Sequence, residues 1–126
     1  MNGISIPKSD QNYYWTRHCI GKIFQYGITA NKIKRIIKYP DRKEEGIAEK
    51  TIAVMRQKSK KDHNKGEEWV MYQLRKSKKI IISAWFYPAI TPKGKQIFIP
   101  DEVWDEIARE NEEDEEKKQK INSIVY

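Results

Sequence analysis

The sequence has only one cysteine and no long apolar run, and both features narrow the kind of protein that it can encode. Cys19 cannot form a disulfide within the chain, and no second cysteine stands near it at metal-ligand spacing. No stretch approaches the roughly 20 apolar residues that cross a bilayer, and residues 1–10 lack the apolar segment of a signal peptide. We therefore expect a cytoplasmic protein without a membrane segment.

The sequence also lacks the motifs of cofactor-dependent and metal-dependent enzymes. It has no glycine-rich phosphate loop, no cysteine and histidine cluster at zinc spacing, and no paired carboxylates at the spacing used by nucleases. No internal repeat is present. We expect neither a cofactor nor a metal.

Acidic residues are scarce in the first 100 positions and abundant in the rest of the chain. Residues 1–100 carry 21 Lys and Arg against 8 Asp and Glu, a net charge of +13, whereas residues 101–126 carry 4 against 10, a net charge of −6. A basic body attracts phosphate polymers, because phosphates that it neutralises release their condensed counterions. An acidic end on the same chain can compete for the same basic surface.

The length of 126 residues suits one domain with a modest core. We expect a flexible lead-in at residues 1–13 and a single α+β domain at residues 14–109. Residues 110–126 read as an acidic, partly frayed tail, since residues 110–120 contain no hydrophobic side chain.

Two helices are predicted near the start of the domain. The first runs from Thr16, a plausible N-cap, to Tyr26, and Gly27 ends it. The second begins after Thr29 and ends at Pro40. It has an apolar stripe of Ile33, Ile36 and Ile37, and its basic residues are Lys32, Lys34, Arg35 and Lys38.

Alternating apolar residues predict three antiparallel strands, near residues 51–56, 68–75 and 80–87, with a lysine-rich loop at 58–67. A loop at 88–100 and a third helix from Asp101 follow, and the docking face of that helix is Val103, Trp104, Ile107 and Ala108. The predicted fold is two N-terminal helices packed on a three- to four-stranded antiparallel sheet, with a C-terminal acidic helix.

The segments "FQYGIT", "YPDR" and "KIIISAW", in that order, resemble the BrnT and RelE-like superfamily of small bacterial ribonuclease toxins. Within that neighbourhood the chain resembles a small bacterial domain family of unknown function, over about residues 14–88. The resemblance implies RNA as the partner, ribosome-associated RNA included, and an acidic antitoxin protein as a second partner. The toxins have an arginine where this chain has Trp85, which favours a non-catalytic relative.

The resemblance also implies cleavage of RNA without a metal, in which a base deprotonates the ribose 2′-hydroxyl and cations stabilise the phosphorane. His18 and Lys22 lie one helical turn apart, so the lysine should lower the pKa of the imidazole and favour its role as a base. We assign His18, Lys22 and Arg42 as candidate catalytic residues for base, charge stabilisation and phosphate contact.

Further basic and aromatic residues are candidates for binding RNA. These are Arg17, Arg35, Arg56, Arg75, Lys78, Lys79 and Trp85.

Alternatives stay open for all of these residues. A single histidine on a short helix is often structural, Arg42 can form turn salt bridges, and sheet aromatics such as Trp85 are commonly core residues. The sequence is therefore compatible with a ribonuclease, with a non-catalytic RNA- or protein-binding module, and with a protein whose acidic tail regulates its own basic surface. It does not indicate an oligomeric state.

Overall fold

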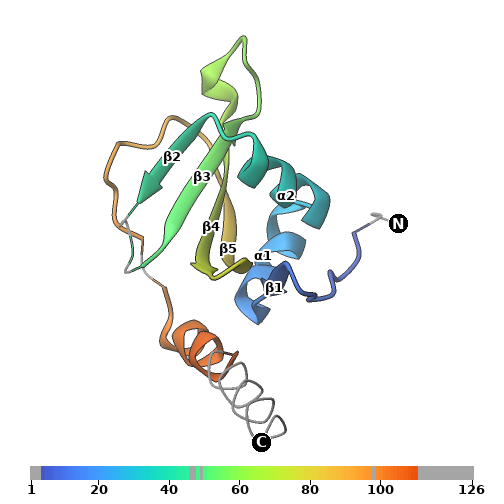
Figure 1. Cartoon of the computed structure of the whole chain (residues 1–126). Coiled ribbons are helices and arrows are strands. Elements are labelled where there is room, and N and C mark those ends of the chain that lie inside the picture. The colour runs from blue at the N-terminus through green and yellow to red at the C-terminus, as the bar shows by residue number, and fades with distance from the viewer. Residues whose placement is uncertain (1–3, 46–47, 49, 98, 111–126) are drawn as a thin grey trace, which may run out of the picture.

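The computed structural model describes residues 4–45, 48, 50–97 and 99–110 and shows an α+β fold (Figure 1). Two helices, α1 (Arg17–Tyr26) and α2 (Ala30–Lys38), lie against a sheet of five strands. The strands are β1 (Tyr13–Trp15), β2 (Arg42–Glu45), β3 (Ile52–Gln57), β4 (Glu67–Arg75) and β5 (Lys78–Tyr87). A 3₁₀ turn, η1 (His63–Lys65), lies in the β3–β4 connection, and residues 101–110 are helical. Within this part of the chain, no helix has the length and apolar character that crossing a membrane requires.

Both N-terminal helices begin where the sequence predicts. The Thr16 Oγ1 atom accepts a hydrogen bond from the Cys19 amide at 3.1 Å, and the Thr29 Oγ1 atom accepts one from the Lys32 amide at 3.2 Å. Each bond satisfies an amide that has no partner inside its helix. Gly27 ends α1 with a φ of 68°, a left-handed conformation that favours glycine.

The α+β class and the packing of two helices on a sheet are confirmed, but the predicted sheet is partly wrong. The strand order is β1-β5-β4-β3-β2, and β1 runs parallel to β5 while the other neighbours are antiparallel. The sheet is therefore mixed and has five strands instead of three or four. β1 begins at Tyr13, inside the predicted lead-in, and β2 lies between the second predicted helix and the first predicted strand, where no strand was predicted.

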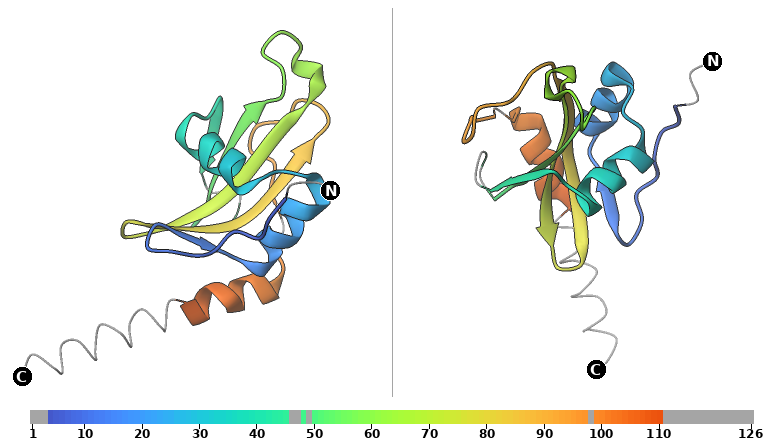
Figure 2. Two further views of the ribbon diagram at one scale, coloured as in Figure 1. Left: turned by 90° about the vertical axis from the view of Figure 1, so that its right-hand side faces the viewer. Right: turned by 90° about the horizontal axis from the view of Figure 1, so that it is seen from above.

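The sheet has a hydrophobic cluster on each face. Figure 2 shows α1 and α2 on one side of the sheet and the C-terminal helix on the other. On the first face, α1 and α2 bury Cys19, Ile23, Ile33 and Ile36 against the strands. On the second face, the helix at residues 101–110 and the preceding segment cover strand residues that include Met55, Trp69 and Met71. The sheet thus lies between a layer formed by α1 and α2 and a layer formed by the C-terminal helix and the segment before it.

The C-terminal helix docks through part of the predicted stripe. Val103 and Ile107 are buried and Trp104 packs against them, as expected. Ala108 is exposed and Glu106 is buried instead. A carboxylate thus takes a place in this interface that the sequence assigned to a methyl group.

Candidate nucleic-acid interface

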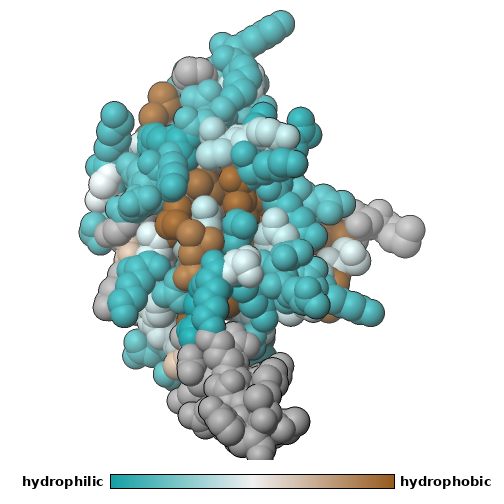
Figure 3. All heavy atoms as spheres, in the orientation of Figure 1, coloured by the Kyte–Doolittle hydropathy of each residue, from teal (hydrophilic) through white to brown (hydrophobic). Residues whose placement is uncertain are grey.

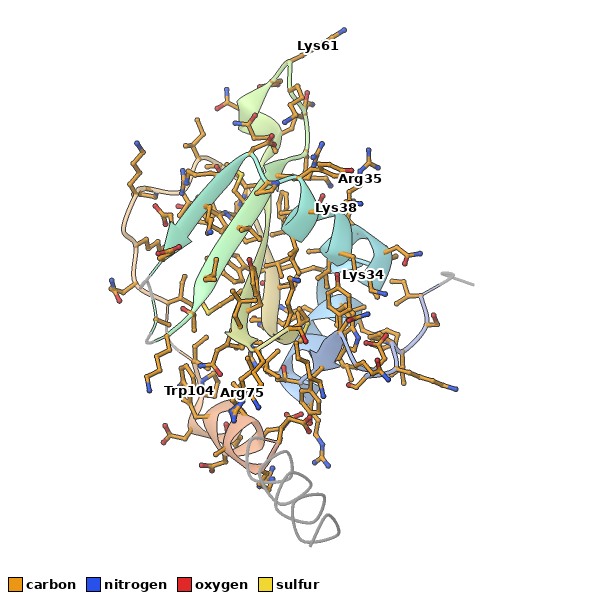
Figure 4. All side chains as sticks on the ribbon, in the orientation of Figure 1. Lys34, Arg35, Lys38, Lys61, Arg75 and Trp104 are labelled. Atoms are coloured by element: carbon orange, nitrogen blue, oxygen red, sulfur yellow. The ribbon has the colours of Figure 1, made fainter. Side chains whose placement is uncertain are left out.

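Helix α2 directs its basic side chains away from the core because its apolar residues all face the sheet. Ile33 and Ile36 are buried, so the residues between and beside them point outward. Figure 4 shows Lys34, Arg35 and Lys38 along this helix. In the same view, hydrophilic residues cover most of the surface, and hydrophobic residues appear over the strands near its middle (Figure 3).

A hollow of about 550 Å³ lies between the C-terminal half of α2 and the strands, and we call it the α2–β1 hollow. It is lined by Tyr13, Lys34, Arg35, Ile37, Lys38, Tyr39, Tyr72 and Lys79. The parallel pairing of β1 with β5 sets Tyr13 opposite Lys79, and this register brings both residues to the rim of the hollow. Four cations and three tyrosines therefore surround one concave site.

A second hollow, of about 230 Å³, lies on the other side of α2, and we call it the α2–β3 hollow. Its lining is Lys32, Arg35, Ile36, Arg56, Gln57, Lys58 and Glu68. The Arg56 Nη1 atom donates a hydrogen bond to the Tyr39 carbonyl oxygen at 2.6 Å, which fixes the chain where α2 ends. Arg35 lines both hollows, so the two sites meet across the helix.

These side chains form the α2 basic surface, which we define as Lys32, Lys34, Arg35, Lys38, Arg56, Lys58 and Lys79. Within the described part of the chain, the one ion pair on this surface joins Lys32 to Glu68 at 3.1 Å. Several of the remaining cations lie over aromatic rings, Lys34 at 4.9 Å from the centre of Tyr13 and Lys38 at 5.5 Å from that of Tyr39. The surface therefore keeps most of its positive charge available to an anion.

His18 lies in a third hollow, of about 330 Å³, between α1 and the C-terminal helix. Its lining is Arg17, His18, Glu102, Val103, Glu106 and Arg109. Partial burial lowers the pKa of His18, the nearby Lys22 lowers it further, and Glu102 opposes both effects. The imidazole is thus favoured in its neutral form, as the spacing of His18 and Lys22 predicts.

Glu106 fixes the C-terminal helix to the start of α1. Its carboxylate accepts hydrogen bonds from the Tyr14 hydroxyl at 2.6 Å and from the Arg17 amide at 3.0 and 3.2 Å. Burial and this bond raise the pKa of Tyr14 above its usual value. The carboxylate caps the positive end of α1, a favourable place for an anion.

Lys22 and Cys19 are neighbours of His18 on α1, and neither forms a hydrogen bond with the imidazole in the described residues. The Lys22 Nζ atom donates to the Gln25 Oε1 atom at 3.2 Å and lies 5.6 Å from the centre of the Tyr26 ring. Cys19 is buried, and burial raises the pKa of its thiol to about 12. The thiol is therefore protonated near neutral pH and is not a nucleophile there.

Arg42 and Trp85 belong to the second face of the sheet. The Arg42 guanidinium lies 4.9 Å from the centre of the Trp69 ring, and the rings of Trp69 and Trp85 stack at 5.8 Å and 1°. The Trp69 indole donates to buried Glu67 at 2.9 Å. These contacts give both predicted site residues a role in packing.

The remaining predicted residues lie toward the C-terminal helix. The Lys78 Nζ atom pairs with the Glu110 carboxylate at 2.8 Å, so an acidic residue already neutralises this lysine. Arg75 lies at the same end of the molecule as Trp104, far from the Lys61 end (Figure 4). The predicted acidic tail beyond Glu110 lies outside the described residues.

The structure therefore divides the predicted site residues among separate places. Arg35, Arg56 and Lys79 come together on the α2 basic surface, whereas Arg17 and His18 lie beside the C-terminal helix. The predicted site residues leave out six residues that line the α2–β1 hollow: Tyr13, Lys34, Ile37, Lys38, Tyr39 and Tyr72. The spacing of Lys34 and Lys38, one helical turn apart, is the signal that could have identified two of them.

In the described part of the chain, no three His, Cys, Asp or Glu residues are grouped so that they could hold a metal ion. Comparison with protein-family models, with curated proteins and with solved structures finds no match to this chain.

Proposed function

We propose that this protein binds RNA through the α2 basic surface. The observation that carries the proposal is the meeting of two basic hollows at Arg35, with one carboxylate, Glu68, among their described lining residues. Cations held together without paired acids bind phosphates strongly, because each neutralised phosphate releases counterions.

The layered arrangement favours a flexible single strand over duplex DNA. A helix that reads DNA enters the major groove with its exposed face. Helix α2 instead packs against the sheet (Figure 1), and a hollow lies on each side of it. Tyrosines line one of these hollows. Such a surface suits a strand whose phosphates and bases can follow concave features, as single-stranded RNA does. The resemblance to BrnT and RelE-like toxins supports RNA as the partner.

Fluorescence anisotropy with a labelled single-stranded RNA at several salt concentrations tests the proposal. If four cations each neutralise one phosphate, the logarithm of affinity should fall with the logarithm of salt with a slope of about −3. Arg35→Glu should weaken binding by at least about tenfold at 0.1 M salt, because this residue serves both hollows.

Lys93→Glu is the matched control. It changes the net charge by the same amount at an exposed residue between β5 and the C-terminal helix, outside both hollows. We expect its affinity for RNA to stay near that of the parent. Absent binding, binding that is insensitive to salt, or equal losses in both variants would refute the proposal.

Cleavage of RNA at His18 is a second candidate function. The specific observation in its favour is an imidazole with a lowered pKa in a hollow that also contains Arg17 and Arg109. The neutral imidazole could take the proton of a ribose 2′-hydroxyl, and the two guanidinium groups could bind the phosphate. In this arrangement Arg109 takes the part that the sequence assigned to Arg42.

A further inference from the structure

The α2–β1 hollow combines charge and aromatic rings in a way that the other two hollows do not. Among its described lining residues there is no Asp or Glu. The α2–β3 hollow includes Glu68, and the hollow beside His18 includes Glu102 and Glu106. An uncompensated set of four cations selects an anionic ligand.

Hydrogen bonds hold the backbone at two of the tyrosines that line this hollow, Tyr13 and Tyr39. The Asp10 carboxylate accepts hydrogen bonds from the Asn12 and Tyr13 amides at 2.8 and 2.9 Å, and Tyr13 stacks on Trp15 at 5.7 Å. Tyr39 stands at the C-cap of α2, where Arg56 binds its carbonyl oxygen. These bonds fix the points at which the two side chains leave the backbone, so less of the chain has to be ordered when a flat ligand binds.

The rings are covered by lysine side chains that a phosphate would attract. Lys34 and Lys79 both lie over Tyr13, at 4.9 and 5.8 Å, and Lys38 lies over Tyr39. Tyr39 is nevertheless 57% exposed. A ligand that carries both a phosphate and a planar base could draw the ammonium groups to its phosphate and stack its base on a ring. Base stacking on an aromatic ring stabilises more than an exposed cation–π contact does.

We propose that the α2–β1 hollow receives one unpaired nucleotide of a single-stranded RNA, with its base against Tyr39 and its flanking phosphates on Lys34, Lys38 and Lys79. The proposal presupposes the RNA binding assigned to the α2 basic surface. The volume of about 550 Å³ lies within the range of sites for small organic ligands. A base in a duplex has its faces stacked on neighbours, so it cannot enter without unpairing. The protein should therefore prefer single strands to duplexes.

The test compares the affinity of the full chain for a short single-stranded RNA and for a blunt RNA duplex of the same sequence. Tyr39→Ala should weaken binding of the single strand by about tenfold and leave duplex binding within about twofold. Tyr39→Phe keeps the ring and should bind like the parent. Tyr26→Ala, at an exposed tyrosine of α1 outside the hollow, is the control and should change neither affinity.

The outcomes separate this inference from RNA binding itself. RNA binding stands if Arg35→Glu weakens it. In that case, equal affinity for single strand and duplex, or no effect of Tyr39→Ala, would overturn the nucleotide site alone. Binding of neither RNA would overturn both. Selective loss of the single strand in Tyr39→Ala, restored in Tyr39→Phe, would support the site.

Discussion

His18 shows how the surroundings of one residue set its chemistry. The charged and titratable groups that face it come from α1 and from the C-terminal helix: Arg17, Lys22, Glu102, Glu106 and Arg109. Burial and Lys22 favour the neutral imidazole, and Glu102 favours the imidazolium. Because burial is the largest of these effects, the pKa of His18 in the folded protein lies below the ordinary histidine value of about 6.5.

The sign of each neighbour's effect can be tested by NMR titration of the His18 ring. We expect Lys22→Gln to raise the pKa of His18 and Glu102→Gln to lower it further. Because the folded pKa lies below the unfolded one, the unfolded chain takes up the proton first as the pH falls, and His18 then destabilises the fold. RNA cleavage with His18 as the base would also slow as the pH falls through this pKa. An unchanged pKa in both variants would contradict this account.

Residue type alone does not place Arg42 and Trp85 on one face of the sheet or the other. Arginine and tryptophan are common in RNA sites, and the sequence alone gives no reason to exclude either. Their roles depend on which face of the sheet they occupy, and this depends on pairing between strands that are distant in the sequence. Here Arg42 lies over Trp69, and Trp85 stacks on the same ring, away from α2.

At the scale of elements, the helices were predictable because their signals are local. Thr16, Gly27 and Thr29 stand next to the segments that they begin or end, and they act there through backbone hydrogen bonds or a permitted φ. The strands β1 and β2 were missed for the opposite reason. β1 has three residues, and β2 reads RKEE with no apolar alternation, so only pairing with β5 and β3 creates them.

The C-terminal helix offers a test of an element held by one buried carboxylate. Glu106→Gln keeps an acceptor but removes the charge that binds Tyr14 and the Arg17 amide. Because charge-assisted hydrogen bonds contribute more than neutral ones, we expect the variant to lose about 1–2 kcal/mol of stability in chemical unfolding. Amide hydrogen exchange in residues 101–110 should also become faster.

Asp105→Asn is the control for this helix. It removes one charge from an exposed neighbouring position and should leave both stability and exchange near those of the parent. If the two variants behave alike, Glu106 does not hold the helix and the account of this interface is wrong.

At the scale of the whole molecule, charge is distributed between two regions. The C-terminal helix brings Glu102, Glu106 and Glu110 close to Arg17, His18 and Lys78, and so offsets positive charge beside α1. The α2 basic surface receives no such cover from the described part of that helix. The charge contrast between residues 1–100 and 101–126 could be predicted from the sequence. Which part of the basic surface the C-terminal helix covers could not, because this depends on where Val103 and Ile107 dock.

The most direct test of RNA binding by the α2 basic surface is NMR mapping of backbone amides during titration with a short single-stranded RNA. We predict that the largest shift changes fall in α2, at Tyr39 and around Arg56 and Lys58, with smaller changes near Lys79. Changes centred instead on the C-terminal helix and His18, or on Trp85 and the second face, would contradict this placement. A titration that leaves the α2 amides unchanged would do the same.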